Sequence, residues 1–273
     1  MKNFNITTKI RKIVYATLVT LDQLLARKQT KIVTLCYHSF DTSDWRFAVP
    51  PGRFEKQMKH MLSLYQPIAL GDINQLVRNR KVISQPSFAV TFDDGYASVW
   101  QLRHICQKLG IKPTVFVLAN PNHANRQELK SAEKFLTIDQ IKELHRLGWE
   151  IGCHSATHPD FSALSPQLAE KEVRFAKARL EKKLGFAVNY FAYPRGRYDQ
   201  TVLAAVNLSA YKLGLTMDDG EMHKEVNPYQ IPRIGVDGSH DFTDFKNLFS
   251  PSVVQARKLI RQSLLGDIYE KSI

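Results

Sequence analysis

The middle of the chain alternates short apolar runs with longer segments whose apolar residues recur every three or four positions. Runs of the first kind fit buried strands, and segments of the second kind fit helices that pack one face. The predicted strands cover 31–36, 88–92, 113–119, 149–153, 189–193, 211–216 and 231–236. The predicted helices between them cover 51–65, 70–79, 97–109, 137–148, 165–185 and 200–208.

Strands that alternate with helices predict an α/β protein with a mostly parallel sheet, either a barrel or a doubly wound fold. The chain has 273 residues, a size at which an α/β barrel commonly forms one domain. It contains no internal repeat and no low-complexity linker. We therefore expect one main domain at 31–245, with an N-terminal helix at 1–30 and a C-terminal helix at 246–273.

The first thirty residues have an apolar stripe of their own. Its members recur at helical spacing and are Ile10, Val14, Leu18, Leu21 and Leu25. Basic residues flank this stripe. The uncharged stretch 13–21 is shorter than the roughly 20 residues that span a bilayer, and no small-x-small cleavage motif follows it. The segment predicts either a basic amphipathic helix on a membrane surface or a helix docked on the domain. Residues 252–273 pose the same alternatives.

The composition is that of a globular protein, with 44% hydrophobic and 23% charged residues, and it excludes a disordered chain. A formal charge of +12 favours anionic surroundings. The basic residues are scattered and not interleaved with aromatic residues, so we expect no nucleic-acid partner. The compartment stays open between the cell envelope or a membrane surface, slightly favoured, and the cytoplasm.

The cysteines do not suggest a redox or structural metal site. Cys36, Cys106 and Cys153 lie in apolar runs and have no CxxC spacing. We expect three small buried side chains and no disulfide framework.

Metal-binding side chains follow two of the predicted strands. Asp93 and Asp94 end the strand at 88–92, and His154 and His158 follow the strand at 149–153. The carboxyl ends of parallel strands meet at one edge, where α/β enzymes build their sites. Two imidazoles and one carboxylate supply the three protein ligands of a typical catalytic zinc, and the second carboxylate is free to act as a general base. Either motif alone occurs often in turns or on surfaces, but their joint placement at strand ends favours metal-assisted hydrolysis.

Three motifs carry a family resemblance. TFDDGY at 91–96, HSATH at 154–158 and FAYPRGRYD at 191–199 resemble, in this order, the first three motifs of polysaccharide deacetylases of the NodB-homology type, carbohydrate esterase family four. LCYH at 35–38, Phe54 and IPRI at 231–234 resemble the branch that acts on poly-N-acetylglucosamine. The resemblance runs from about residue 31 to 236. It implies a distorted (β/α) barrel of about seven parallel strands and a hydrolase of carbon–nitrogen bonds other than peptide bonds.

The resemblance also implies roles for individual residues. Asp93 would be the general base, and Asp94, His154 and His158 would bind a divalent metal, zinc before cobalt, nickel or iron. A metal-bound water would attack the acetyl carbonyl, with the backbone N–H of Arg195 stabilising the oxyanion. The residues expected beside the substrate are Tyr193, Pro194, Arg195, Gly196 and Arg233.

The chain departs from the family pattern at two points. Ala192 replaces the arginine that many members carry, and we expect Arg233 to orient Asp93 in its place, the alternative being a surface salt bridge. The usual Leu-x-His of the general acid is missing near the C-terminus. His223 and His240 remain as candidates, although idle surface histidines are expected at such positions. His38 follows a strand and fits either the rim of the site or a buried structural role.

Together these patterns predict a metal-dependent enzyme that removes N-acetyl or O-acetyl groups from a polysaccharide or oligosaccharide. The expected partners are an acetylated glycan and, through the N-terminal helix, a membrane surface. The alternative is a catalytically weak or inactive carbohydrate-binding relative, which the missing acid and Ala192 would explain.

Overall fold

The computed structural model describes residues 2–27, 31–79, 85–125, 129–130, 133–220, 222 and 225–262. His223 and the part of the predicted C-terminal helix at 263–273 lie outside these residues. Among the described residues, no helix is long and apolar enough to cross a membrane. The predicted division at residues 30 and 245 stays a prediction.

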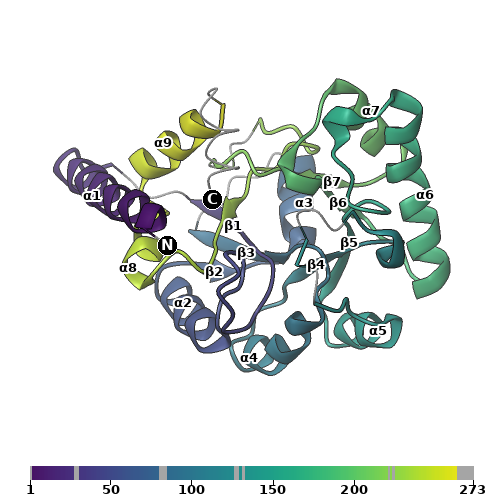
Figure 1. The fold of residues 1–273 in the computed structure, drawn as a ribbon, viewed down its shortest axis with the longest axis horizontal. Coiled ribbons are helices and arrows are strands. Elements are labelled where there is room, and N and C mark those ends of the chain that lie inside the picture. Colours follow the sequence, from purple (N-terminus) through teal and green to yellow (C-terminus); the bar gives the residue numbers. More distant parts are fainter. Residues whose placement is uncertain are drawn as a thin grey trace.

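A curled sheet of parallel strands forms the centre of the molecule (Figure 1). Seven strands lie in the order β7-β6-β5-β4-β3-β1-β8, and β2 pairs with the start of β3. Their bounds are β1 Ile32–Tyr37, β2 Gln66–Pro67, β3 Ser87–Phe92, β4 Thr114–Val117, β5 Glu150–Cys153, β6 Tyr190–Ala192, β7 Leu213–Leu215 and β8 Ile234–Gly235. A bridge between Leu215 and Ile231 brings the two edges of the sheet together. The predicted distorted barrel of about seven parallel strands is confirmed.

Helices cover the outside of the sheet. In Figure 1, α2, α4 and α5 lie along the bottom, α6 and α7 on the right, and α1, α8 and α9 on the left. Their bounds are α1 Lys2–Leu24, α2 Pro51–Leu64, α3 Leu70–Asn79, α4 Arg103–Lys108, α5 Ile138–Arg146, α6 Pro166–Leu184, α7 Gln200–Leu208, α8 Phe242–Asn247 and α9 Pro251–Gln262. The predicted helix at 97–109 is split into a 3₁₀ segment, Ala97–Leu102, and α4.

Two layers of apolar side chains hold these elements together. One layer, between the strands and the outer helices, includes Val33, Phe92 and Val173. The other packs Ile73 of α3 with residues such as Phe116 on the opposite side of the strands. Because both sides of the strands are covered, most strand residues are apolar, as is usual in parallel sheets.

The ends of the helices follow local sequence signals. Thr137 and Gln140 form the predicted capping box at the start of α5. Ser165 caps α6, and Gly185 ends it with a φ of 83°, a conformation that a glycine adopts without steric cost.

Candidate active site

The carboxyl ends of β3 and β5 bring a carboxylate and two imidazoles together, with β4 between the two strands. The ligand atoms of Asp94, His154 and His158 all lie within 4.8 Å of one another. The Nε2 atoms of His154 and His158 lie 3.4 Å and 3.5 Å from the same oxygen, Oδ1 of Asp94. All three residues are buried. The three residues expected to bind metal therefore share one position in the fold.

The backbone around this cluster is strained. Seven non-glycine residues among those described have a positive φ, and four of them lie in the expected motifs: Asp94, Ser155, His158 and Arg195. Such conformations cost about 1–3 kcal/mol each and persist where the surroundings enforce them. Their concentration here indicates that the side chains are held in fixed directions.

Hydrogen bonds orient the two histidines. Nδ1 of His154 lies 2.8 Å from the carbonyl oxygen of Ala192, so this nitrogen carries the hydrogen and Nε2 presents a lone pair. The backbone N–H of His158 donates to Oγ of Ser155 at 2.9 Å, so this serine braces the histidine loop. Glu172 of α6 accepts from the N–H groups of Ala156 and Thr157. No local pattern pointed to Glu172, because it reaches the loop from a separate helix.

The cluster fits a divalent cation. Oδ1 of Asp94 is buried and has no hydrogen-bond partner among the described residues, although it faces two ring nitrogens. A buried carboxylate oxygen opposite a nitrogen lone pair is costly unless a positive charge lies between them. Two imidazoles and one carboxylate form a donor set that suits zinc and related metals.

The electrostatics of the two histidines agree with this fit. Burial lowers the pKa of His158 to about 4, which keeps its imidazole neutral, as a metal ligand must be. Burial acts in the same direction on His154, but the charges of Asp93 and Asp94 outweigh it and raise the pKa of His154 above 6.5. The carboxylates therefore favour a positive charge at this point.

Asp93 lies beside the cluster but is held by Arg233. The guanidinium group binds both carboxylate oxygens, with Nη1 2.6 Å from Oδ1 and Nη2 2.7 Å from Oδ2. Burial would raise the pKa of Asp93, but the charge and hydrogen bonds of Arg233, together with His154 and His38, outweigh burial and lower the pKa below its usual value. Asp93 is thus kept ionised, and its Oδ2 lies 4.0 Å from Nε2 of His154.

Arg233 is not part of a surface salt bridge, because its side chain is completely buried. Its remaining contacts are with Thr91 Oγ1 at 3.1 Å and the carbonyl oxygen of Thr216 at 3.0 Å. A direct contact with substrate, the other role expected for it, has no support in this arrangement, since all of these contacts are internal. The geometry agrees with a residue that positions Asp93.

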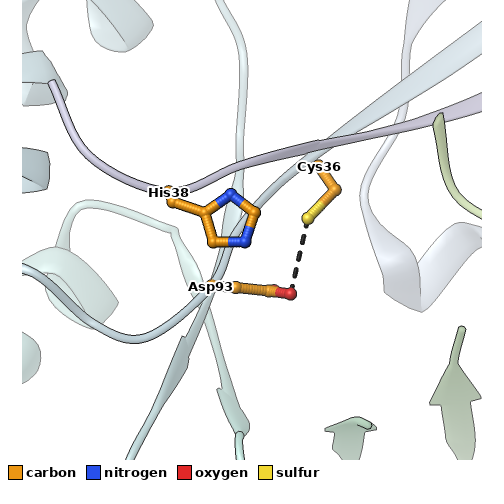
Figure 2. Close-up of side chains that lie close together, drawn as sticks. All are labelled: Cys36, His38 and Asp93. Carbon is orange, nitrogen blue, oxygen red and sulfur yellow. Dashed lines mark hydrogen bonds between the residues drawn. The ribbon is translucent and has the colours of Figure 1, made fainter. Parts of the chain in front are cut away.

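A second group of ligand-type atoms lies on the other side of Asp93 (Figure 2). Sγ of Cys36 lies 3.4 Å from Oδ2 of Asp93, and a ring nitrogen of His38 lies within 4.8 Å of both side chains. This group does not fit a metal, because Arg233 occupies both oxygens of Asp93 and burial raises the pKa of the Cys36 thiol far above its usual value. His38 is half-buried, and its Nδ1 has no hydrogen-bond partner among the described residues. Its place at the rim of the site stays a prediction.

The motif after β6 forms a tight turn at the same edge. Tyr193 is fully buried and donates its hydroxyl to the carbonyl oxygen of Tyr229 at 2.9 Å, so its ring has no surface to offer a sugar. Pro194 is buried, and the side chain of Arg195 binds Asp160 at 2.7 Å. Gly196 has a φ of 68°, and a Cβ there would lie 2.5 Å from Cβ of Met217. The oxyanion role of the Arg195 N–H stays a prediction.

His240 is not an idle surface histidine. It is buried, and its Nδ1 lies 3.0 Å from Oδ1 of Asp237. Arg46 binds the other oxygen of Asp237 at 2.9 Å. The backbone N–H of Asp237 donates to Nδ1 of His240 at 3.2 Å, so His240 belongs to the loop after β8, whereas His38 lies beside Asp93.

Comparisons with known proteins agree on one family. A family model described as polysaccharide deacetylase matches residues 80–217. The Bacillus subtilis protein YxkH, named as a polysaccharide deacetylase, is 27% identical over 212 residues, which cover 77% of this chain and 72% of YxkH. A poly-β-1,6-N-acetyl-D-glucosamine N-deacetylase of Staphylococcus aureus is 22% identical over 201 residues, covering 69% of this chain and 67% of that protein.

Solved structures show the same fold. The deacetylase PplD of Streptococcus pyogenes, in complex with acetate, has a TM-score of 0.70 at 25% identity and covers 82% of this chain and 100% of PplD. IcaB of Ammonifex degensii has a TM-score of 0.69 at 20% identity and covers 82% of this chain and 97% of IcaB. At that identity the second likeness concerns the fold alone.

Proposed function

The chain belongs to the polysaccharide deacetylase family, and on this premise we propose that it is a metal-dependent hydrolase that removes N-acetyl groups from a glycan. The observation that carries the metal dependence is the buried oxygen Oδ1 of Asp94, which lacks a hydrogen-bond partner and faces Nε2 of both His154 and His158. These three residues would hold the cation, most readily zinc. When bound there, a divalent cation polarises the acyl oxygen of the substrate and acidifies a water molecule.

Asp93 acts as the general base in this proposal. Oδ1 receives one N–H of Arg233 and keeps a second lone pair, whereas Oδ2 accepts from both Arg233 and Sγ of Cys36. The carboxylate is fixed in direction and stays ionised, so it can accept the proton of the attacking water as soon as one is placed beside it. Its low pKa makes it a weak base, and this suits a water whose acidity is already raised.

His38 is the group best placed to protonate the leaving amine. Its ring lies beside Asp93, with a nitrogen within 4.8 Å of the carboxylate, and the residue is half-buried (Figure 2). Burial lowers the pKa of His38, which makes its protonated ring a stronger acid. We assign to His38 the proton transfer that the missing C-terminal motif would otherwise supply.

The turn at 194–196 forms the opposite wall of the site. Arg195 has a φ of 60°, and its side chain is drawn away to Asp160. We propose that its backbone N–H stabilises the oxyanion, a contribution for which the identity of the side chain is irrelevant. Loss of one such donor costs about 100-fold or more in rate.

An N-acetylated glucosamine polymer is the substrate class that the relatives support. The Staphylococcus aureus relative is named as an N-deacetylase of poly-β-1,6-N-acetyl-D-glucosamine. O-acetylated glycans are the alternative substrate, and they are distinguished by offering both kinds of acetylated oligosaccharide to the same preparation.

Metal content and acetate release, measured together, test this function. The wild-type protein should contain about one equivalent of zinc or a similar metal per chain, and His158→Ala should contain almost none. His104→Ala, at an exposed position on α4, is the matched control and should keep its metal. Acetate release from N-acetylglucosamine oligomers should stop after chelation and return with zinc or cobalt. Binding of the oligomer without acetate release, with metal present, would instead establish the inactive carbohydrate-binding alternative.

A further inference from the structure

The face of α1 that is turned to solvent is apolar. Five aliphatic side chains on it are exposed, from 42% for Leu21 to 79% for Leu24, and the others are Ile10, Ile13 and Val14; Leu25, directly after the helix, is 54% exposed. At ~100° per residue these positions fall in one stripe along the helix. The stripe extends over roughly 22 Å, at ~1.5 Å per residue. Figure 1 shows α1 at the left margin of the molecule, beside α8 and α9.

The opposite face of α1 is docked by polar contacts. Asp22 is buried and accepts hydrogen bonds from the N–H and Oγ of Ser252, at 2.9 Å and 2.6 Å. Arg11 donates to Oδ2 of Asp244 at 2.9 Å. A docked helix normally buries its apolar stripe and exposes its charges. Here Asp22 and Arg11 fix the rotation of the helix, so that most of the stripe faces outward.

Helix α9 extends the exposed surface. It runs antiparallel to α1, because Ser252 contacts Asp22 and Arg257 contacts the hydroxyl of Tyr15. The later part of α9 therefore lies beside the start of α1. Exposed aliphatic residues occur there as well: Leu259 and Ile260.

The charge around this surface is positive. Lys9 is exposed on α1, about 40° around the helix from the position of Ile13. Arg27 is exposed three residues after the end of α1. Lys258 and Arg261 lie on α9, and neither helix has an exposed carboxylate among its described side chains. The whole chain has a formal charge of +12. Aliphatic side chains flanked by lysine and arginine match the interface of a bilayer with anionic headgroups.

We propose that the outer face of α1, with the adjoining end of α9, docks the protein on an anionic lipid surface. A second copy of the chain fits less well. In a two-fold dimer the same patch meets itself, which would bring Lys9 and Arg27 of both copies close together. One helical stripe is also small beside the roughly 800 Å² that each partner buries in a stable interface. A lipid surface needs no complementary shape.

Sedimentation with vesicles tests this proposal on the full chain. The wild-type protein should bind vesicles of phosphatidylglycerol and phosphatidylcholine, and bind pure phosphatidylcholine far more weakly. The double variant Ile13→Ser, Leu24→Ser should bind about 10- to 100-fold more weakly, since two aliphatic side chains no longer enter the interface. Lys9→Gln with Lys258→Gln should weaken binding to the anionic vesicles only.

Leu208→Ser is the matched control. Leu208 is 85% exposed on α7, on the opposite side of the molecule from α1 in Figure 1, and its replacement should leave vesicle binding unchanged. Acetate release from a soluble oligomer should be unchanged in all of these variants, so a failed docking test is separable from a failed deacetylase assignment. Absence of wild-type binding, or equal binding by the α1 variants, would overturn the proposal. So would a dimer in sedimentation equilibrium that Ile13→Ser, Leu24→Ser dissociates, which would identify a second copy as the occupant.

Discussion

The edge of the sheet that holds Asp94 and the outer face of α1 depart in opposite directions from the usual distribution of side chains. At the sheet edge, ionisable groups are buried, including Asp93, Asp94 and Arg233. On α1, aliphatic side chains are exposed while Asp22 is buried. Most proteins segregate their residues the other way, so a buried charge or an exposed apolar patch is the informative observation.

The two regions differ in what remains unsatisfied. At the sheet edge, Arg233 accounts for both oxygens of Asp93, and one buried oxygen of Asp94 stays without a hydrogen bond. This unpartnered oxygen is a single atom whose lone pairs point in fixed directions, which suits a small cation. On α1 the exposed aliphatic stripe offers no directional contacts, which suits a lipid interface. The geometry of the unsatisfied group therefore indicates the size and chemistry of the proposed ligand.

The largest expected effect, a loss of activity, separates the proposed general base from a proposed metal ligand. Asp93→Asn should keep the bound metal and lose about 10²- to 10⁴-fold in kcat, because the base is replaced by an amide that cannot accept the proton. His154→Ala should lose both metal and activity. Acetate release and elemental analysis of the two variants check this. Full activity of Asp93→Asn would show that another group takes the proton.

The next effect concerns the burial of charge at the same edge. Arg233→Met leaves the carboxylate of Asp93 buried without a counter-charge, and breaking such a pair costs about 3–5 kcal/mol. Urea unfolding measures the loss. The double variant Asp93→Asn, Arg233→Met should recover part of it, since the uncompensated charge is gone. A loss below about 1 kcal/mol in the single variant would mean that Asp93 does not depend on Arg233.

Much of this could be predicted from the sequence, because the decisive patterns are local. Apolar residues that recur every three or four positions gave α3 and α7 with their observed bounds. The gathering of Asp94 with His154 and His158 followed from a rule of topology, since parallel strands end at one edge.

The partners that reach the site from afar could not be predicted with the same ease. Glu172 reaches the histidine loop from α6, and no signal in the sequence pointed to it. The contact of Arg233 with Asp93 spans 140 positions, and it was expected only through the family resemblance. Such contacts depend on how β8 and α6 are placed in space, and no local pattern encodes that placement. The rotation of α1 is a similar case, because the contacts of Asp22 and Arg11 determine which face is docked.

The half-buried ion pair of Asp41 with Lys130 lies between these two regions in burial. Its loss should change the free energy of unfolding by an intermediate amount. Burial would raise the pKa of Asp41, but hydrogen bonds from Lys130 and Ser43 outweigh it and lower the pKa to about 2. A carboxyl with a lower pKa in the folded state stabilises the fold above its unfolded pKa of about 3.9 and loses this contribution as the pH falls through the folded value.

The comparison of wild type with Asp41→Asn tests this directly. The side chain of Asp41 is 32% exposed, so solvent screening limits the difference in the free energy of unfolding at pH 7 to about 1 kcal/mol. The difference should shrink between about pH 4 and pH 2. Unfolding curves at several pH values measure it, and a constant difference across this range would contradict the ion pair.

The smallest effect is expected on the outer face of α1. Ile13→Ser should change the free energy of unfolding by less than about 0.5 kcal/mol, because this side chain is 68% exposed and has little packing to lose. The same replacement at Ile73, which is fully buried in α3, should cost about 3 kcal/mol or more. Urea unfolding of both variants measures the contrast. If Ile13→Ser lost as much as Ile73→Ser, and the loss grew with protein concentration, the stripe would be an interface between copies of the chain. If the outer face of α1 binds a lipid surface, Ile13→Ser should lower the free energy of unfolding only slightly, and the loss should not depend on protein concentration. The aliphatic side chains of this face would then contribute to binding and not to folding.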